Sequence, residues 1–278
     1  MVLRARTIAV LVAMGILAGS SLYGADGSIT LAIVIDGSNK EDRAPLQAYL
    51  TKAMGQSVSV EAPGTFKETV AGLADGSYDF ACLGALVYIR AHAKYGVIPL
   101  VQRASDLRYH SVFITGTDSS IHSLRDLKGK KFAFGDIDST SAHLMAYREL
   151  KQAGIDPETD LKSRYSGSHP ATAAMVANGT VDAGAIDETV FDFLIRGGQL
   201  DTSKVRVFYT SKPYLDYVYV ARKHVSDSTR ERFVHALLAL QQGIDDPVLR
   251  VLRADKFVVA DDQEYTVTRQ IAHELNMF

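Results

Sequence analysis

Short apolar runs rich in β-branched residues alternate with helical stretches along the chain from residue 29 onward. The run from Ile29 to Ile35 is almost continuously apolar, which is typical of a strand covered on both faces. Similar runs predict further strands at 58–62, 79–83, 97–102 and 110–115, with helices between them at 41–54, 67–74 and 86–94. This alternation of β and α units predicts parallel sheets with helices on both faces.

A second series of the same kind begins near Thr117. It predicts strands at 131–134, 181–186, 205–209 and 217–221, and helices at 142–153, 168–178 and 230–242. No long linker, low-complexity segment or internal repeat separates the two series. We therefore expect two α/β lobes connected by strands, with a ligand cleft between them.

The first 24 residues have the pattern of a secretory signal peptide. Arg4 and Arg6 make a basic start, an apolar run from Ile8 to Leu17 follows, and small residues lead to Gly24. The run is shorter than the roughly 20 apolar residues that a membrane span needs. We expect residues 1–24 to be removed and the mature chain to be periplasmic; the alternative is a buried N-terminal helix.

Composition narrows the classes of function. The 278 residues include 30 Lys and Arg against 32 Asp and Glu, with 8 His and 1 Cys. This balance disfavours both intrinsic disorder and nucleic-acid binding. A single cysteine excludes an intramolecular disulfide and a thiolate-rich metal site. The sequence has no Walker motif, no Gly-x-Ser-x-Gly elbow and no His-x-x-x-His spacing, so we expect no enzyme, cofactor, catalytic residue or metal site.

The candidate chemistry lies in the hydroxyl residues Ser139, Thr140 and Ser141, between the strand at 131–134 and the next helix. One hydroxyl is enough to cap a helix, and an ordinary N-cap is one interpretation of this run. Three hydroxyls with successive backbone N–H groups at a positive helix end can also hold an oxyanion without a cationic side chain. These residues alone leave both interpretations open.

The stretch from Asp126 to Leu144, which contains these hydroxyls, closely resembles the signature of phosphonate- and phosphite-type periplasmic binding proteins, the solute receptors of ABC importers. Shorter segments are similar to other family motifs: Asp79–Gly84 with Tyr88, Gly167–His169, Ala177–Gly179, Val181–Gly184 and Gly243–Pro247. The resemblance implies a class II-type binding protein with two α/β lobes, each a mostly parallel sheet flanked by helices. It divides the chain into residues 25–112 plus 216–278 for lobe 1 and 113–215 for lobe 2, with crossings near Ser111–Gly116 and Ser211–Val220.

The same resemblance implies roles for individual residues. Ser139, Thr140 and Ser141 would hold the oxygens of the anion, and Tyr109 and His169 match a pocket tyrosine and a pocket histidine of the family. Without the family resemblance, His169 would be interpreted as a surface residue at the start of a helix. Phe66 falls where relatives often place a tyrosine over the ligand, and core packing is an equally good interpretation of it.

Two positions bear on the choice of ligand. Asp216, near the return crossing, is a candidate for the acid that pairs with the amine of aminoalkylphosphonates in relatives, although Tyr217 competes for that position. For the second acid of those relatives, Asp187 and Glu188 lie only near the matching position, which favours a compact oxyanion over a zwitterion. Cys82 stands where relatives often carry an aromatic residue. It is either a small buried hydrophobe or a thiolate ligand for trivalent arsenic, as in related arsenite sensors.

We therefore expect a monomeric periplasmic substrate-binding component of an ABC transporter. It would capture phosphite, a phosphonate or a similar tetrahedral oxyanion by hinge closure and deliver it to a membrane permease. The alternative is a periplasmic arsenite sensor that signals to a histidine kinase, with Cys82 as the ligand.

Overall fold

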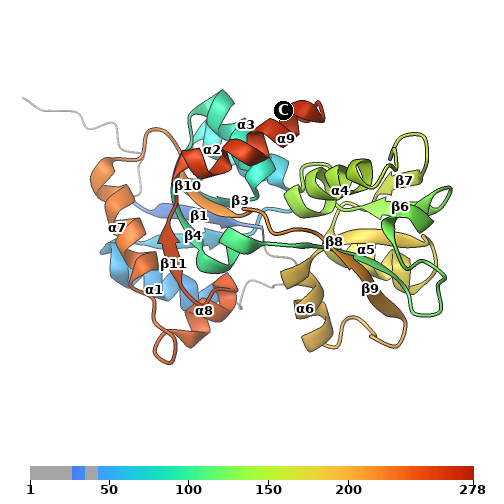
Figure 1. Cartoon of the computed structure of the whole chain (residues 1–278). Helices are drawn as coiled ribbons and strands as arrows, with labels where there is room; N and C mark the ends of the chain where they lie inside the picture. Colours follow the sequence, from blue (N-terminus) through green and yellow to red (C-terminus); the bar gives the residue numbers. More distant parts are fainter. Residues whose placement is uncertain (1–26, 35–42) are drawn as a thin grey trace, which may run out of the picture.

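The computed structural model of the chain describes residues 27–34 and 43–278, so the predicted signal peptide at 1–24 lies outside the described residues. Two α/β lobes lie side by side, each built around one sheet (Figure 1). Among the described helices, none combines the length and apolar character needed to cross a membrane.

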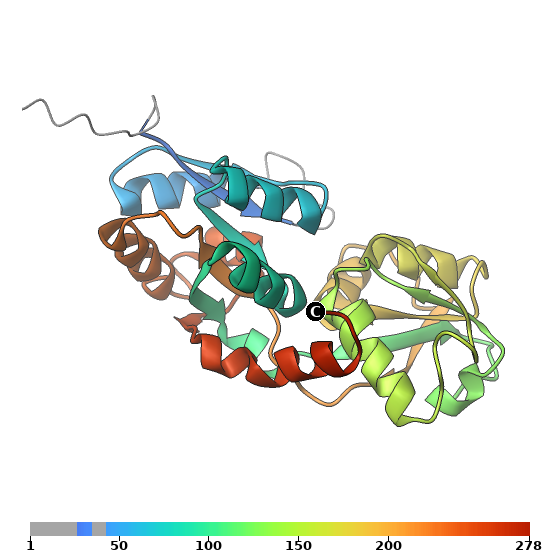
Figure 2. The same cartoon turned by 90° about the horizontal axis from the view of Figure 1, so that it is seen from above.

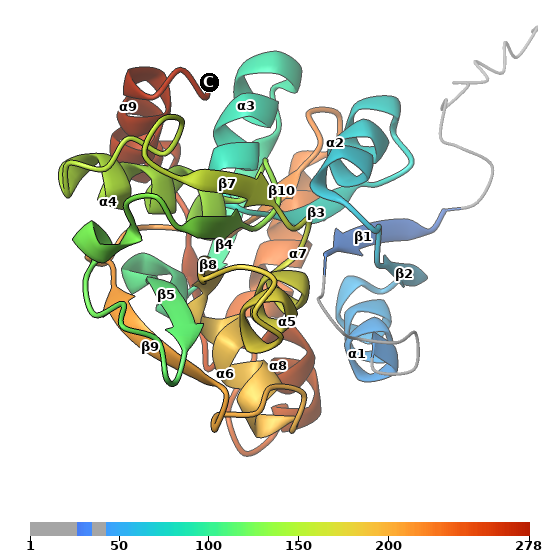
Figure 3. The ribbon, with the colours of Figure 1, turned by 90° about the vertical axis from the view of Figure 1, so that its right-hand side faces the viewer.

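The first lobe is built on a six-stranded sheet with the strand order β11-β4-β10-β3-β1-β2. Its strands are β1 (Ile29–Ile33), β2 (Val58–Glu61), β3 (Phe80–Leu83), β4 (Ile98–Arg103), β10 (Val218–Ala221) and β11 (Phe257–Val259). One face packs against α1 (Ala44–Met54), α7 (Asp227–Leu238) and α8 (Asp246–Leu252). The other face packs against α2 (Phe66–Asp75), α3 (Ala85–Tyr95) and α9 (Thr266–Glu274), so this sheet is covered on both sides (Figure 3).

The second lobe is built on a five-stranded sheet with the order β7-β6-β8-β5-β9. Its strands are β5 (Ser111–Gly116), β6 (Lys131–Phe134), β7 (Lys162–Tyr165), β8 (Ala183–Asp187) and β9 (Val205–Thr210). The helix α4 (Ala146–Gln152) covers one face, and the π-helix η4 (Thr140–Met145), which precedes it, packs its Leu144 and Met145 with apolar residues of the first lobe. The helices α5 (His169–Ala177) and α6 (Glu188–Arg196) cover the other.

Both sheets are mixed. The parallel pairing expected from the β-α alternation is found where β1 pairs with β2 and β3, and where β6 pairs with β7 and β8. The antiparallel pairs all involve strands next to a crossing between lobes or the last strand, namely β5, β10 and β11. A strand that returns from the other lobe enters its sheet from the opposite end, so it runs against its neighbours.

The two crossings run next to each other as an antiparallel pair (Figure 2). The Tyr109 amide donates to the Tyr214 carbonyl at 2.8 Å, and the Tyr214 amide donates back at 3.0 Å. Ser111–Gly116, where the first crossing was expected, lies wholly within β5 of the second sheet. The chain changes lobe just before it, after the 3₁₀-helix η2 (Ala104–Arg108). The expected boundary at 112/113 therefore falls inside β5, and the lobe limits stay a prediction.

Three helices that begin near the junction of the lobes have a Thr, Ser or Asp side chain as their N-cap. Thr65 Oγ1 accepts from the Glu68 amide at 3.1 Å at the start of α2. Ser168 caps α5, and Asp187 caps α6 with a bond of 2.9 Å from the Val190 amide. Each cap satisfies an otherwise unpaired backbone donor and fixes the direction in which the helix leaves the strand before it.

Gly184 in β8 allows α5 to approach the second sheet closely. A Cβ at this position would lie 2.5 Å from Thr172 Cγ2 of α5 and 3.0 Å from the Ala133 carbonyl oxygen. We predict that Gly184→Ala lowers the free energy of unfolding by about 1–3 kcal/mol, measured by urea denaturation, because helix and sheet must move apart. Gly116→Ala is the control, since its nearest neighbour is 3.9 Å away. Equal stability of both variants would contradict the prediction.

Candidate functional site

Loops from both sheets meet between the lobes and line a pocket with about 480 Å³ of empty space, its open mouth included. The lining residues come from both lobes and from the second crossing: Val34, Gly64, Thr65, Phe66, Asp136, Ser139, Gly167, Ser168, His169 and Tyr217. Most of them follow the carboxyl ends of β1, β2, β6 and β7, which is where open α/β sheets place their ligands. We refer to this space as the oxyanion pocket.

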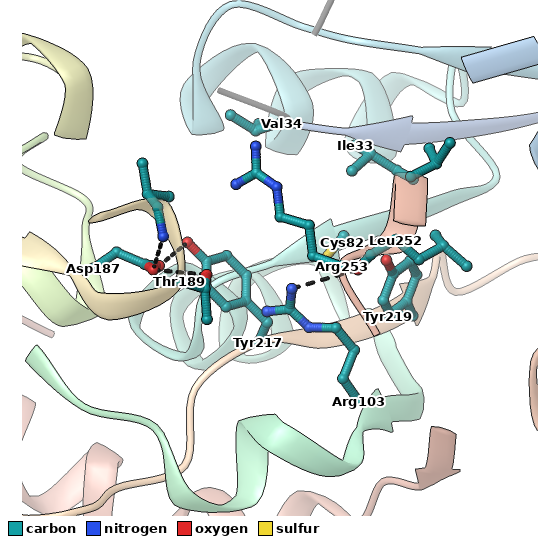
Figure 4. Close-up of a pocket in the computed structure, with 12 residues that line it drawn as sticks. Ile33, Val34, Cys82, Arg103, Asp187, Thr189, Tyr217, Tyr219, Leu252 and Arg253 are labelled. Carbon is teal, nitrogen blue, oxygen red and sulfur yellow. Dashed lines mark hydrogen bonds between the residues drawn. The ribbon is translucent and has the colours of Figure 1, made fainter. Parts of the chain in front are cut away.

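A second pocket lies beside it and shares Val34 and Tyr217 with it (Figure 4). The remaining lining residues are Ile33, Cys82, Arg103, Asp187, Thr189, Val190, Tyr219, Val251, Leu252 and Arg253. Arg103 is held by Asp106 through two bonds of 2.8 and 2.6 Å, and its guanidinium stacks on the Tyr217 ring at 5.0 Å. We call this space the side pocket.

Ser139 is both a helix cap and a wall of the oxyanion pocket. Its Oγ accepts from the Ala142 amide at 3.0 Å, while its backbone carbonyl accepts from the Leu144 amide at 3.1 Å. This second bond spans five residues, so the helix expected from about Ala142 begins as the wider π-helix η4 at Thr140. The cap uses only the acceptor of the Ser139 hydroxyl, and its proton can reach either Ser141 Oγ at 3.4 Å or an anion in the pocket. The two interpretations of this residue are therefore compatible.

The neighbouring hydroxyl residues Thr140 and Ser141 are buried and do not line the oxyanion pocket. Thr140 Oγ1 accepts from the Leu86 amide of α3 at 3.1 Å, a contact between the lobes. The Ser141 carbonyl accepts from Ser111 Oγ at 2.7 Å. Both residues support the loop that presents Ser139, and their predicted direct contact with the ligand stays a prediction.

His169 lines the oxyanion pocket at the first position of α5 and is only 7% exposed. Its Nδ1 accepts from the Asp187 amide at 3.3 Å. The neutral ring therefore carries its proton on Nε2, which makes Nε2 a hydrogen-bond donor. The start of α5 adds the positive end of the helix dipole. Pro170 has no N–H group, and the amides of Ala171 and Thr172 donate to the side chain and the carbonyl of Ser168.

Asp187 is a residue that the sequence analysis did not assign to the site. It ends β8, caps α6 and lines the side pocket, and its Oδ1 accepts from Thr189 Oγ1 at 2.8 Å. Burial alone would raise its pKa, but nearby His169 and hydrogen bonds from Tyr109, Val190 and Thr189 hold the pKa below its usual range. An acidic residue directly after a buried strand and before a helix was the sequence signal for it.

Tyr109 lies behind the pockets and lines neither. Its hydroxyl bonds to Thr189 Oγ1 at 2.7 Å, and its ring packs edge-on against Tyr217 with centroids 5.7 Å apart. Burial raises its pKa well above the usual value, so the phenol stays protonated. Tyr109 thus orients Tyr217, which lines both pockets, and its predicted contact with the ligand remains untested.

Phe66 and Cys82 reach the space between the lobes from the first sheet. Phe66, the first residue of α2, is half-buried against the core and also lines the oxyanion pocket, which fits both interpretations of it. Cys82 in β3 lines the side pocket. Burial raises the pKa of its thiol to about 12. The thiolate that a soft metalloid centre requires is therefore strongly disfavoured in this form of the protein.

Asp216 lies on the second crossing and lines neither pocket. Its Oδ1 accepts from the Ala85 amide at the start of α3 at 3.1 Å, and Oδ2 has no hydrogen-bond partner among the described residues. Burial raises its pKa to about 8, opposed by the Ala85 bond and reinforced by Asp187 and Asp106. Tyr217, the other candidate in the sequence for the residue that contacts the ligand, lines both pockets.

The oxyanion pocket thus offers hydroxyl and imidazole donors at the positive end of a helix. Its lining residues include one carboxylate, Asp136, and no lysine or arginine. Within the described part of the chain, no group of three or more His, Cys, Asp or Glu side chains is arranged to hold a metal ion. The chemistry available here is the directional binding of a small oxyanion.

The buried Asp216 carboxyl predicts a dependence of stability on pH. Its pKa is raised from 3.8 to about 8 on folding, so its contribution is complete below about pH 4 and is lost as the pH rises through about 8. We predict that Asp216→Asn, which cannot ionise, flattens this loss. Thermal unfolding at about pH 5 and pH 8.5 checks it. The same change in melting temperature for both proteins would contradict the raised pKa.

Comparisons with known proteins identify the family of the chain. Residues 36–265 match the family model of the periplasmic substrate-binding proteins of phosphonate ABC transporters. A probable ABC transporter phosphite-binding protein, PhnD1 of Prochlorococcus marinus, is 29% identical over 222 residues, or 74% of this chain and 75% of that protein. The tetrathionate sensor histidine kinase TtrS of Salmonella typhimurium is 24% identical, and the match covers 84% of this chain and 42% of the kinase.

Solved structures show the same fold. The structure of Prochlorococcus marinus PhnD1 in complex with methylphosphonate superposes with a TM-score of 0.83 and 25% identity, covering 90% of this chain and 99% of that chain. A binding protein of a Pseudomonas aeruginosa phosphonate transporter superposes with a TM-score of 0.80 and 23% identity, covering 91% and 87%. The family match spans most of the chain, and the two-lobed fold agrees with it. The chain therefore belongs to the family of periplasmic substrate-binding proteins of ABC phosphonate transporters.

Proposed function

We propose that this receptor captures phosphite or a small phosphonate between its lobes and delivers it to an ABC permease. The observation that carries the proposal is the convergence of Ser139, His169 and the start of α5 on one pocket, with Phe66 on the opposite lobe. The relatives whose names include phosphite and the neighbour bound to methylphosphonate support this choice of ligand.

Binding proceeds by closure of the lobes around the anion. The Ser139 hydroxyl and the His169 Nε2–H group donate to the oxygens at the positive end of α5, and Phe66 and Tyr217 cover the remaining surface. The Asp136 carboxylate in the wall opposes net attraction of an anion, so affinity comes from aligned hydrogen bonds in a space shielded from water. A small ligand suits such a site because most of its polar atoms can be satisfied at once.

The proposal also covers the export of the chain, its oligomeric state and its recognition by the permease. Residues 1–24 direct the chain to the periplasm and are removed there, and the mature receptor acts as a monomer. The closed, loaded form is the one that the permease recognises, because only closure brings surfaces of both lobes into one arrangement.

Cys82 is the basis for the alternative ligand, arsenite, and for a sensor role. It lines the side pocket, but its thiol is buried and its pKa is raised to about 12. Trivalent arsenic would have to bind a single, protonated sulfur. We therefore treat arsenite binding as an outcome to be tested rather than as a second proposal.

The choice of ligand can be tested by calorimetric titration of the mature protein with phosphite, methylphosphonate, phosphate, arsenate and arsenite. We expect phosphite or methylphosphonate to bind most tightly and arsenite to give no heat, because the pocket offers donors for oxygen atoms and no thiolate. Cys82→Ala should leave the affinity for phosphite unchanged. Binding confined to arsenite and lost in Cys82→Ala would overturn the proposal.

The role of Ser139 can be separated from its role as a helix cap. We expect Ser139→Ala to weaken phosphite or methylphosphonate binding by about 10- to 100-fold, because one donor to the anion is lost. Ser226 caps α7 in the same way, accepting from the Thr229 amide at 3.3 Å, and does not line either pocket. Ser226→Ala should therefore lower the melting temperature without changing the dissociation constant. Equal affinity of the Ser139 variant and the wild type would contradict the assignment.

A further inference from the structure

We propose that the ion pair between Arg90 and Asp138 is a latch: it stabilises the closed arrangement of the lobes and holds the loop that presents Ser139. The inference rests on the proposed function, which identifies the ligand that the lobes enclose when they close. Arg90 belongs to α3 of the first lobe, and Asp138 directly precedes Ser139 in the second. Their Nη1 and Oδ1 atoms are 2.7 Å apart.

Arg90 is itself fixed before it reaches across the junction. Its Nε donates to the Met277 carbonyl at 2.8 Å, and its Nη2 donates to the same oxygen. This carbonyl follows α9, whose end lies at the junction of the lobes (Figure 2). A planar guanidinium held on one edge presents its other edge in a set direction, so little side-chain freedom remains to be lost when Asp138 arrives.

A second contact between the lobes lies one turn earlier on the same face of α3. Leu86 and Arg90 are four residues apart, a spacing that places them on one helix face. The Leu86 amide, in the first helical turn and without a helical partner, donates to Thr140 Oγ1 at 3.1 Å. This face of α3 therefore contacts the second lobe at Asp138 and at Thr140, the residues on either side of Ser139.

The remaining supports of the loop lie within the second lobe and do not depend on closure. Asp136 Oδ1 accepts from the Asp138 amide at 2.7 Å, and the Ile137 carbonyl accepts from His143 Nδ1 at 2.6 Å. Separation of the lobes breaks the contacts of Arg90 and Leu86 but leaves these bonds in place. The latch thus links the position of Ser139 to the closed state, with no contact of its own to the ligand.

The test uses Asp138→Asn, which removes the charge and keeps the size and the backbone amide. Both partners are about one-third exposed, at 35% and 31%, so the effect is modest. We expect methylphosphonate to bind about three- to fivefold more weakly, mainly through faster dissociation, and the difference to shrink at high salt. Arg90→Lys should recover part of the affinity that Arg90→Gln loses.

The matched control is an ion pair confined to one lobe. Arg222 pairs with Asp79 at 2.9 Å with exposures of 28% and 19%, and both residues belong to the first lobe. Arg222→Gln should lower the melting temperature of the ligand-free protein and leave the dissociation rate unchanged. If Arg90→Gln likewise lowered the melting temperature and left the dissociation rate unchanged, Arg90 would have only a structural role, and the latch would be overturned.

A second measurement does not depend on the ligand. Spin labels at Lys52→Cys in α1 and Lys204→Cys before β9 report the distance between the lobes, and the native Cys82 is too buried to be labelled. Asp138→Asn should shift the ligand-free protein toward longer distances. Identical distance distributions would overturn the latch, whether or not the wild type binds methylphosphonate. Absence of binding by the wild type would instead overturn the proposed function.

Discussion

The paired crossings at Tyr109 and Tyr214 are the constraint on which the rest of the structure depends. Two backbone hydrogen bonds join the segments at the point where both pass between the lobes, and the Asp216 amide adds a third by donating to the Asp106 carbonyl at 3.1 Å. Two neighbouring strands joined in this way can bend together far more easily than they can slide or separate. The pair therefore constrains how the lobes sit relative to each other, and Tyr217 of the second crossing lines the oxyanion pocket beside it.

The proposed binding of an anion without a lysine or arginine in the pocket wall depends on side-chain donors placed at helix starts. His169 begins α5, and Ser139 precedes η4, so two helix starts from the second lobe converge on the same space. Asp187 fixes which nitrogen of His169 carries the proton by donating its amide to Nδ1. The near-neutral composition of the chain is thus compatible with an anionic ligand, because fixed N–H and O–H groups supply the positive ends of the dipoles.

The sequence located the pocket wall where a residue both belongs to a motif and begins or precedes a helix at the sheet edge. Ser139, His169 and Phe66 satisfy this condition, and all three line the oxyanion pocket. Tyr109 and Asp216 do not, because their side chains point into the hinge rather than the pocket. No one-dimensional pattern distinguishes these directions, since adjacent residues on a crossing segment face opposite sides.

The sequence by itself determined the two-lobed α/β class, the family and the loop that carries the hydroxyls, because hydrophobic periodicity and local motifs depend on neighbouring residues. The elements β7, α6, α8, β11 and α9 escaped it. The patterns of β7, α8 and β11 are too brief to show a period, whereas α6 and α9 carry an amphipathic period that was present in the sequence and went unused. Only the tertiary structure decided that Thr140 contacts the first lobe, that Cys82 lies in a separate side pocket, and that Arg90 reaches Asp138. These facts depend on how the two lobes meet, which is set by contacts between residues far apart in the chain.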